Sequence, residues 1–310
     1  MPGGLLMATS SDGRASPKPS TTTSEQLQIL RARGLVINDE ATAIRVLEHH
    51  NYYRLSVYRL PFTLPGDADQ FLPGTTFEQI WGLYQFDQTL RALVWSGCER
   101  VEISLRARWA YEVAHGLGPV AYTRPTYAQN VSRHNESLKR LRDELQRSSE
   151  EFVKHHTVTL GQEWPPSWVV AEVATFGTIS MLVKNIRDPL VRQRIATSYH
   201  LDERVVGSVM HHLSVVRNFA AHHSRLWNRI FVNPPRLPRT PRALSLSTAP
   251  EFPRNIYNTL VLLAHLIQCV QPGDPWPRAV RDHLHTLDPA LLPRLGAPGD
   301  WSTRPIWAAL

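Results

Sequence analysis

The chain has 310 residues, of which 42% are hydrophobic and 20% charged, so it can bury a large core and is not disordered as a whole. Its formal net charge is +7, and of its 34 basic residues only Lys18, Lys139, Lys154 and Lys184 are lysines. This excess of arginine suits a nucleic-acid partner, because a guanidinium binds phosphate through two parallel donors, but a GC-rich genome produces the same bias.

Cysteine usage and hydropathy argue against several classes of protein. Cys98 and Cys269 lie far apart and neither belongs to a C-x-x-C pair, which argues against a zinc site or a disulfide framework. The N-terminus shows no basic segment followed by an apolar core, and the longest apolar run, Thr259–Val270, is too short and too polar to cross a bilayer. We therefore expect a cytoplasmic protein without a membrane partner.

The N-terminal quarter of the sequence predicts a tail followed by a small helical region. Residues 1–19 are rich in Gly, Ser, Pro and Ala without periodicity, and we expect them to be disordered. Residues 20–74 form the N-terminal helical region, with Asn38 or Asp39 as the cap of its second helix. Its first helix begins at a capping box, formed by Thr22 with Glu25 or by Thr23 with Gln26.

The pattern of residues 75–310 predicts the main helical core of the protein. Thr75 with Glu78 is a further capping box, and Asp202 is a candidate N-cap. Apolar residues recur with helical spacing along five long segments, and Gly97 is a position at which the first segment can kink or divide. The expected helices are Thr76–Ala114, Ser132–His156, Ser167–Asn185, Asp202–Phe219 and Ile256–Val270.

The segments between and after these helices predict loops. Pro65–Gly74 and Asn233–Pro253 are rich in proline and other turn residues, and Leu295–Leu310 predicts a coil that contains Pro and Trp. The sequence shows no strand alternation of useful length and no internal repeat. It therefore predicts an all-α fold.

The stretch Arg217–Arg229, RNFAAHHSRLWNR, concentrates groups that can act on a phosphodiester. Arg217 offers a fixed cation for phosphate, and His222 offers an imidazole that titrates near neutral pH. On an ideal helix, five steps of 100° place these two side chains about 140° apart. Either the helix loosens after Phe219, or two copies of the chain meet across a two-fold axis to complete one site.

Other interpretations of this stretch are structural. In one of them, Arg217 pairs with a core carboxylate while His222 or His223 caps the end of the helix. A metal site is excluded, because His211 and His222 share a helix face but lie about 16 Å apart along it. A Ser/His/Asp triad lacks a nucleophile elbow. We therefore expect no metal or other cofactor.

Two further groups of residues favour structural roles. Glu102 and Arg106 have the spacing of a routine helix pair. This spacing favours a solvated helix face over the alternative, in which the Glu102 carboxylate orients Arg217 across the bundle. For Tyr52–Arg54 we favour core and cap positions over a role in stacking on RNA bases.

The motif Arg217-Asn218-x-x-x-His222 resembles the R-N-x-x-x-H motif of HEPN ribonucleases. Its continuation to Arg229 resembles the Abi family, the AbiD/AbiF-like abortive-infection proteins of bacteria, although Phe219 is bulkier than the small or aliphatic residue usual after the Asn. The resemblance covers nearly all of the chain after Lys18. Its other segments are Leu30–Phe62, Arg100–Arg106, Pro166–Gly177 and Leu295–Trp301.

This resemblance implies an all-α HEPN core around a helical bundle, usually dimeric, in which Arg and His of both copies form one RNA-cleaving cleft. It assigns Arg217, Asn218 and His222 to the catalytic site.

Three neighbouring residues are candidates for contacts with RNA. His223 is also the second candidate for the base, and Arg225 and Arg229 lie just beyond the motif.

Two functions are compatible with these residues. The first is an RNA endonuclease that acts as a toxin or phage-defence effector, controlled by a trigger and by a small RNA or protein antitoxin. The second is a non-catalytic module that holds a small regulatory RNA. The intact set of Arg217, Asn218 and His222 favours the endonuclease.

Overall fold

The computed structural model describes residues 19–310, so the tail expected at residues 1–19 lies outside the described residues except for Pro19. The chain divides into two compact units, Met1–Gln85 and Phe86–Leu310, each described by itself below. Helices dominate both units, which confirms the expected all-α class. Within the described residues, no helix combines the length and apolarity that crossing a bilayer requires.

The first unit contains three short helices whose starting points follow from their caps. The Thr22 hydroxyl accepts from the Glu25 N–H while the Glu25 carboxylate accepts from the Thr22 N–H, as the capping box predicted. Asp39 caps the second helix and Asn51 the third. The elements are α1 (Thr23–Ala32), α2 (Glu40–His49), α3 (Tyr52–Ser56), the 3-10 turn η1 (Leu60–Phe62), β1 (Thr63–Leu64), β2 (Asp67–Phe71) and the first turns of α4 (Phe77–Leu117).

Part of the expected loop Pro65–Gly74 is a strand. Leu64 pairs with Asp67 across a tight turn in which Gly66 has a φ of 83°, a conformation that Gly adopts without a steric cost. In β2 only Phe71 is buried. The strand therefore has no apolar alternation by which the sequence could reveal it.

The capping box expected at Thr75 and Glu78 forms one residue later. The Thr76 hydroxyl accepts from the Gln79 N–H, and the Gln79 side chain accepts from the Thr76 N–H. Glu78 instead accepts from the Asp39 N–H, which ties the start of α4 to the start of α2.

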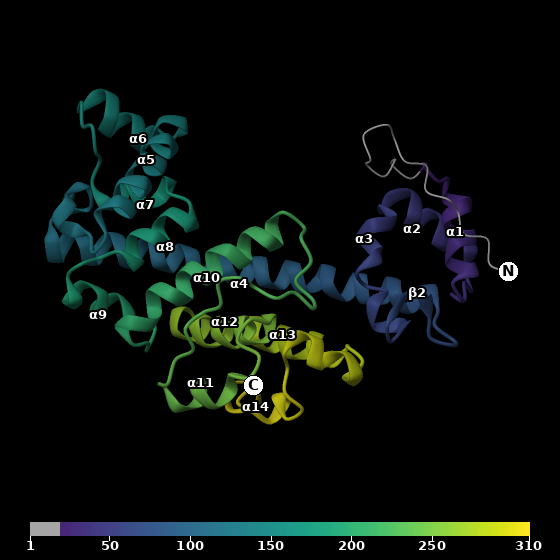
Figure 1. Ribbon diagram of the computed structural model, residues 1–310. Helices are drawn as coiled ribbons and strands as arrows, with labels where there is room; N and C mark the ends of the chain where they lie inside the picture. The colour runs from purple at the N-terminus through teal and green to yellow at the C-terminus, as the bar shows by residue number, and fades with distance from the viewer. Residues whose placement is uncertain (1–18) are drawn as a thin grey trace. The chain divides into compact units, whose positions relative to one another are not determined.

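In the second unit, α4 is a long helix that bonds to α10 and α13 through its side chains and backbone (Figure 1). Its buried face repeats at helical spacing through Leu90, Val94, Val101, Leu105 and Trp109, all fully excluded from solvent. The other elements are η2 (Ala121–Thr123), η3 (Pro125–Tyr127), α5 (Val131–Arg147), α6 (Glu151–Lys154), the π-helical turn η4 (His155–Thr159), α7 (Ser167–Val173), α8 (Phe176–Lys184), α9 (Pro189–Thr197), α10 (Glu203–Ala221), α11 (Arg242–Ser247), α12 (Ile256–Val270), α13 (Trp276–His285), η5 (Pro289–Leu295), η6 (Trp301–Thr303) and α14 (Pro305–Ala308).

Gly97 does not divide α4, which continues through it. A Cβ atom at this position would lie 2.6 Å from the ring of Trp276. The Trp276 indole also donates to the Leu93 carbonyl at 2.7 Å. Gly97 therefore permits the close packing of α13 on α4.

Two expected helices are interrupted, because Ser and Thr compete with helical hydrogen bonding. The span Ser132–His156 divides after Arg147, where the backbone of Ser148 is extended, into α5 and α6. The span Ser167–Asn185 divides into α7 and α8 at Thr175, which leaves the helical conformation and caps α8 through its hydroxyl.

The C-terminal part of the chain is more ordered than predicted. The expected loop Asn233–Pro253 contains α11, and the expected coil Leu295–Leu310 contains η6 and α14. Trp307 is fully buried, and its indole N–H donates to the hydroxyl of Tyr257 on α12. These helices are shorter than the window over which periodicity can be recognised. In contrast, α12 has the bounds expected from its apolar run.

A buried histidine couples the stability of the second unit to pH. His212 on α10 contacts the Asn233 carbonyl and the Thr259 hydroxyl, each at 2.8 Å. Burial lowers the pKa of His212 from 6.5 to about 4, although the bond to Asn233 opposes the shift. Burial also lowers the pKa of His134, His265 and His283.

We predict that acid destabilises the protein before its carboxylates titrate. Because the folded state holds His212 neutral, its contribution is complete above pH 6.5 and is lost as the pH falls toward 4. Between about pH 7 and pH 5, this one group should remove about 2 kcal/mol from the free energy of unfolding. Urea unfolding at the two pH values measures the loss. His212→Gln should show a smaller loss; an equal loss in both proteins would contradict the assignment.

Candidate functional site

Arg217 lies near the end of α10 and is held by a buried carboxylate on α4. Its Nε and Nη2 donate to Glu102 Oε2 at 3.1 and 2.7 Å, and the Glu102 side chain is only 9% exposed. Arg106, one turn further along α4, pairs with the other oxygen of Glu102. The prediction that Glu102 and Arg106 form a solvated pair is therefore wrong. Glu102 lies against α10, and its carboxylate bridges the guanidinium groups of Arg106 and Arg217.

The Arg217 guanidinium has a further polar neighbour in the motif. Its Nη1 donates to Asn218 Oδ1 at 3.1 Å, and Asn218 itself is exposed. A guanidinium has more N–H groups than these contacts use, so Arg217 can still bind an oxyanion. The side chain is 26% exposed, which gives such a ligand access.

The end of α10 excludes one of the two alternatives that the sequence left open. The helix does not loosen after Phe219, because α10 continues to Ala221 and the His222 N–H still bonds to the Asn218 carbonyl. His223 then adopts a left-handed conformation with φ of 57°. The Ser224 N–H reaches the Phe219 carbonyl and the His223 N–H reaches that of Ala220, which is the Schellman arrangement.

This ending decides how the two histidines are presented. His222 is the C-cap and His223 follows it, and both side chains are exposed. His223 therefore does not lie on the core stripe, where an ideal continued helix would have placed it. Among the described residues, hydrogen bonds join Arg217 to Asn218 but do not join either of them to the His222 side chain.

The contacts that the structural interpretation predicted are present: Arg217 pairs with a core carboxylate, and His222 is the C-cap of the helix. These contacts do not exclude chemistry, since they fix the arginine and leave the imidazole accessible.

The loop after α10 is anchored by a residue that the sequence analysis missed. Asp87 on α4 is fully buried and accepts from the backbone N–H groups of Trp227 at 2.7 Å and Leu226 at 3.1 Å. Arg91, one turn along α4, pairs with the same carboxylate. The sequence did offer one signal for this role, because Asp87 is a charged residue on the same helix face as the apolar Leu90.

Arg225 and Arg229 also have structural partners in this loop. Arg225 Nη1 donates to the carbonyls of Trp227 and Asn228, at 2.9 and 2.8 Å. The Arg229 guanidinium lies 4.2 Å from the centre of the Phe219 ring. Both arginines therefore stabilise the loop conformation, and their contact with RNA stays a prediction.

The thiol nearest to this ion-pair network is not a candidate nucleophile. Cys98 is fully buried on α4, and burial raises the pKa of its thiol. Thiol reactivity requires the thiolate and access to it, and Cys98 has neither. No group of three or more His, Cys, Asp and Glu side chains in residues 19–310 is arranged to hold a metal ion.

We predict that removing the Asp87 carboxylate destabilises the second unit strongly. Asp87→Ala leaves the buried charge of Arg91 and two backbone N–H groups without this acceptor, which should cost roughly 3–5 kcal/mol. Asp87→Asn retains an acceptor for the backbone and should cost less. Urea unfolding measures both.

Asp143→Ala, at an exposed position on α5, is the matched control and should change stability by no more than about 0.5 kcal/mol. If Asp87→Ala behaves like this control, the carboxylate does not anchor the loop.

Comparison with known proteins places this site within a family. No curated protein and no solved structure matches the chain. A family model described as Abi-like protein matches residues 45–228, more than half of the chain, and this span includes Asp87, Glu102 and the whole of α10. The chain therefore belongs to the Abi-like protein family.

Proposed function

We propose that this protein is a metal-independent RNA endonuclease of the HEPN type that acts in bacterial phage defence by abortive infection, as a toxin or effector. The observation that carries the proposal is the pairing of a fixed cation with an accessible imidazole at one helix end. Arg217 is fixed by buried Glu102, and His222 is exposed five residues later.

The reaction follows from these two side chains. The 2′-oxygen of the ribose attacks the adjacent phosphorus, the bond from phosphorus to O5′ breaks, and the products carry a 2′,3′-cyclic phosphate and a 5′-hydroxyl. His222 takes the 2′-hydroxyl proton, and the imidazolium that forms returns a proton to O5′. Arg217 neutralises the charge that develops on the non-bridging oxygens, and Asn218 offers its side-chain amide to a phosphate oxygen.

Two copies of the chain would complete this site. The continued helical path through His222 supports this arrangement, because it keeps Arg217 and His222 on different sides of one helix end. Two exposed side chains that neighbour the site residues in sequence are open to a second copy: Ala221 precedes His222, and Ile103, which follows Glu102 on α4, is 61% exposed. A two-fold dimer pairs one surface with the same surface of the second copy.

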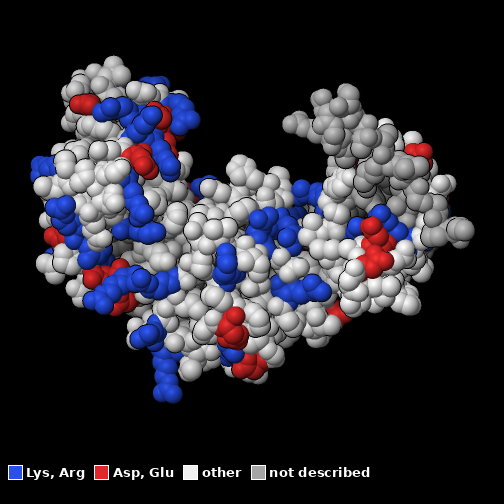
Figure 2. Space-filling model, in the orientation of Figure 1, with Lys and Arg blue, Asp and Glu red and all other residues white. Residues whose placement is uncertain are grey.

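The charge distribution supports RNA as the substrate. The net charge is +7, and Figure 2 shows Lys and Arg side chains over α5 and α6, with Asp and Glu among them. Near the site, His223, Arg225 and Arg229 are the candidates for contacts with the RNA. Binding that depends on such contacts weakens with salt, since each neutralised phosphate releases counterions.

We predict that His222→Ala abolishes RNA cleavage while the fold and most RNA affinity remain. Loss of general acid–base catalysis costs on the order of 10²–10⁴-fold in rate. Arg217→Ala should lose cleavage and also weaken binding, and Arg217→Lys should recover only part of the activity, because an ammonium cannot reproduce the guanidinium fork. The measurement is single-turnover cleavage of total RNA in EDTA, with mapping of the product ends.

His155→Ala is the control, because His155 is exposed on η4, away from the motif in sequence. Cleavage by His222→Ala at the rate of this control would show that the site assignment is wrong. A wild-type protein that binds RNA and cuts none, with or without infecting phage, would instead favour the non-catalytic module that holds a regulatory RNA.

We also predict that two inactive variants complement each other. If a site takes Arg217 from one copy and His222 from the other, a mixed dimer of Arg217→Ala with His222→Ala contains one intact site. Random mixing of equal amounts should restore about a quarter of the wild-type rate. The test mixes the variants under conditions that exchange subunits, with light scattering to establish the dimer. Absence of any recovery in proven mixed dimers would contradict a composite site.

A further inference from the structure

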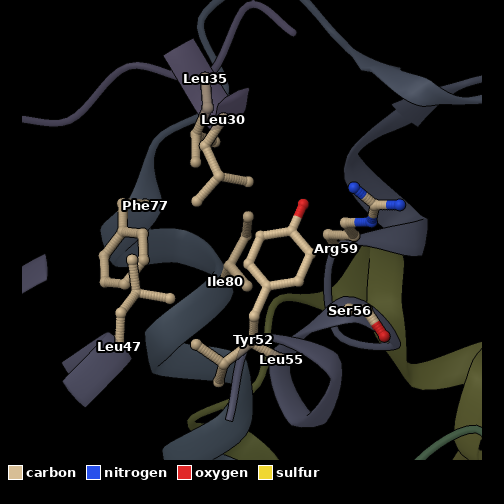
Figure 3. Close-up of a pocket in the computed structure, with 9 residues that line it drawn as sticks. All are labelled: Leu30, Leu35, Leu47, Tyr52, Leu55, Ser56, Arg59, Phe77 and Ile80. Atoms are coloured by element: carbon tan, nitrogen blue, oxygen red, sulfur yellow. The ribbon is translucent and has the colours of Figure 1, made fainter. Parts of the chain in front are cut away.

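The first unit contains a groove that the proposed reaction does not use. It has a volume of about 840 Å³ and lies between α1, the end of α2, α3 and β2. Its polar lining includes Arg33, Arg59, Asp69 and Gln26, together with the aromatic Tyr52 and Tyr53. Arg59 and Tyr52 also line a small apolar cavity beside the groove (Figure 3).

The two arginines of this groove share one weak acceptor. Arg33 Nη2 and Arg59 Nη2 approach the same oxygen of Asp69, at 3.0 and 3.4 Å, and the Asp69 side chain is 63% exposed. The Nε and Nη1 atoms of Arg59 are buried and have no hydrogen-bond partner. A buried donor of a charged group that has no acceptor lowers the stability of the folded state. An oxyanion that accepted from the Arg59 guanidinium would therefore be bound favourably.

Tyr52 presents a further donor at the same place. Its hydroxyl oxygen accepts from Arg33 Nη1 at 3.0 Å, so the hydroxyl proton is available to an oxygen in the groove. Figure 3 shows Tyr52 and Arg59 among the side chains that line the apolar cavity, and both residues also line the groove.

The groove also offers an acceptor and an aromatic surface. The Oε1 atom of Gln26 is buried without a partner, while its amide nitrogen donates to Thr21. Tyr53 is 74% exposed, and its ring meets that of Tyr52 edge to face. A hydroxyl or amino group of a ligand would satisfy Gln26, and a planar ring would stack on Tyr53.

We infer that this groove binds a nucleotide, with its phosphate on Arg33, Arg59 and the Tyr52 hydroxyl and its base against Tyr53. A nucleotide combines an oxyanion for the unpaired donors of Arg59, a donor group for Gln26 Oε1 and a flat ring. Glu48 and Asp69 also line the groove and oppose an anion. Arg59 must therefore turn from Asp69 toward the phosphate, and a phosphate provides stronger charge-assisted bonds than this shared oxygen.

This inference does not rest on the proposed nuclease reaction, because none of its residues belongs to the Arg217–His222 site. Two sources share the chemistry: a free nucleotide, and the phosphorylated end of a single-stranded RNA.

Calorimetric titration of the full-length protein tests the inference. The probes are adenosine monophosphate, a short single-stranded RNA with a 5′-phosphate, and inorganic phosphate. Arg33→Gln and Arg59→Gln should each weaken binding of every probe that binds by at least about tenfold. Tyr53→Ala should weaken the two probes that carry a base and leave inorganic phosphate unchanged.

Arg45→Gln on α2 is the matched control, because Arg45 is exposed and does not line the groove. Circular dichroism establishes that each variant is folded, and Tyr53→Ala, at an exposed position, keeps the test decisive should Arg59→Gln fail to fold. Binding of the mononucleotide identifies the free ligand, and binding of the RNA alone identifies an RNA end. Binding by the groove variants equal to that of Arg45→Gln, or no binding of any probe by the wild type at millimolar concentration, would overturn the inference.

Discussion

The contact between Arg217 and Glu102 is the interaction on which the candidate site depends. A carboxylate that is 9% exposed is stable only if its charge is compensated, and Glu102 has a guanidinium on each oxygen, from Arg217 on α10 and from Arg106 on α4. The pair has a geometric consequence, since it fixes the last turns of α10 against the middle of α4.

A second buried carboxylate continues this anchoring beyond the helix. Asp87 lies on the same helix as Glu102 and accepts from the backbone of the loop that follows α10. Between these two anchors the chain makes a Schellman turn and presents His222 and His223 to solvent. The protein thus orders the surroundings of His222 through backbone and cation contacts while the imidazole itself stays accessible, as a proton-transfer group requires.

The contact between Arg217 and Glu102 is compatible with a structural role and with a catalytic role of the motif. A guanidinium that is paired on one edge can bind phosphate on another, so the Glu102 contact is consistent with a fixed cation in a reaction. The groove of the first unit differs in this respect. There the guanidinium groups of Arg33 and Arg59 share a single exposed carboxylate, and buried donors of Arg59 have no acceptor, so a ligand would add what the fold does not supply.

The sequence by itself determined the fold class, most long helices and the motif, because these depend on local periodicity, caps and residue type. The apolar run Ile256–Val270 is a helix with those bounds, and Asp202, Thr22 and Asp39 cap the helices that they were expected to cap. Only the tertiary structure decided the partners. Glu102 is buried because α10 lies against it, although its spacing from Arg106 is that of a solvated pair. The burial of Asp87 and of Trp307 likewise depends on contacts with residues distant in sequence, which no local pattern records.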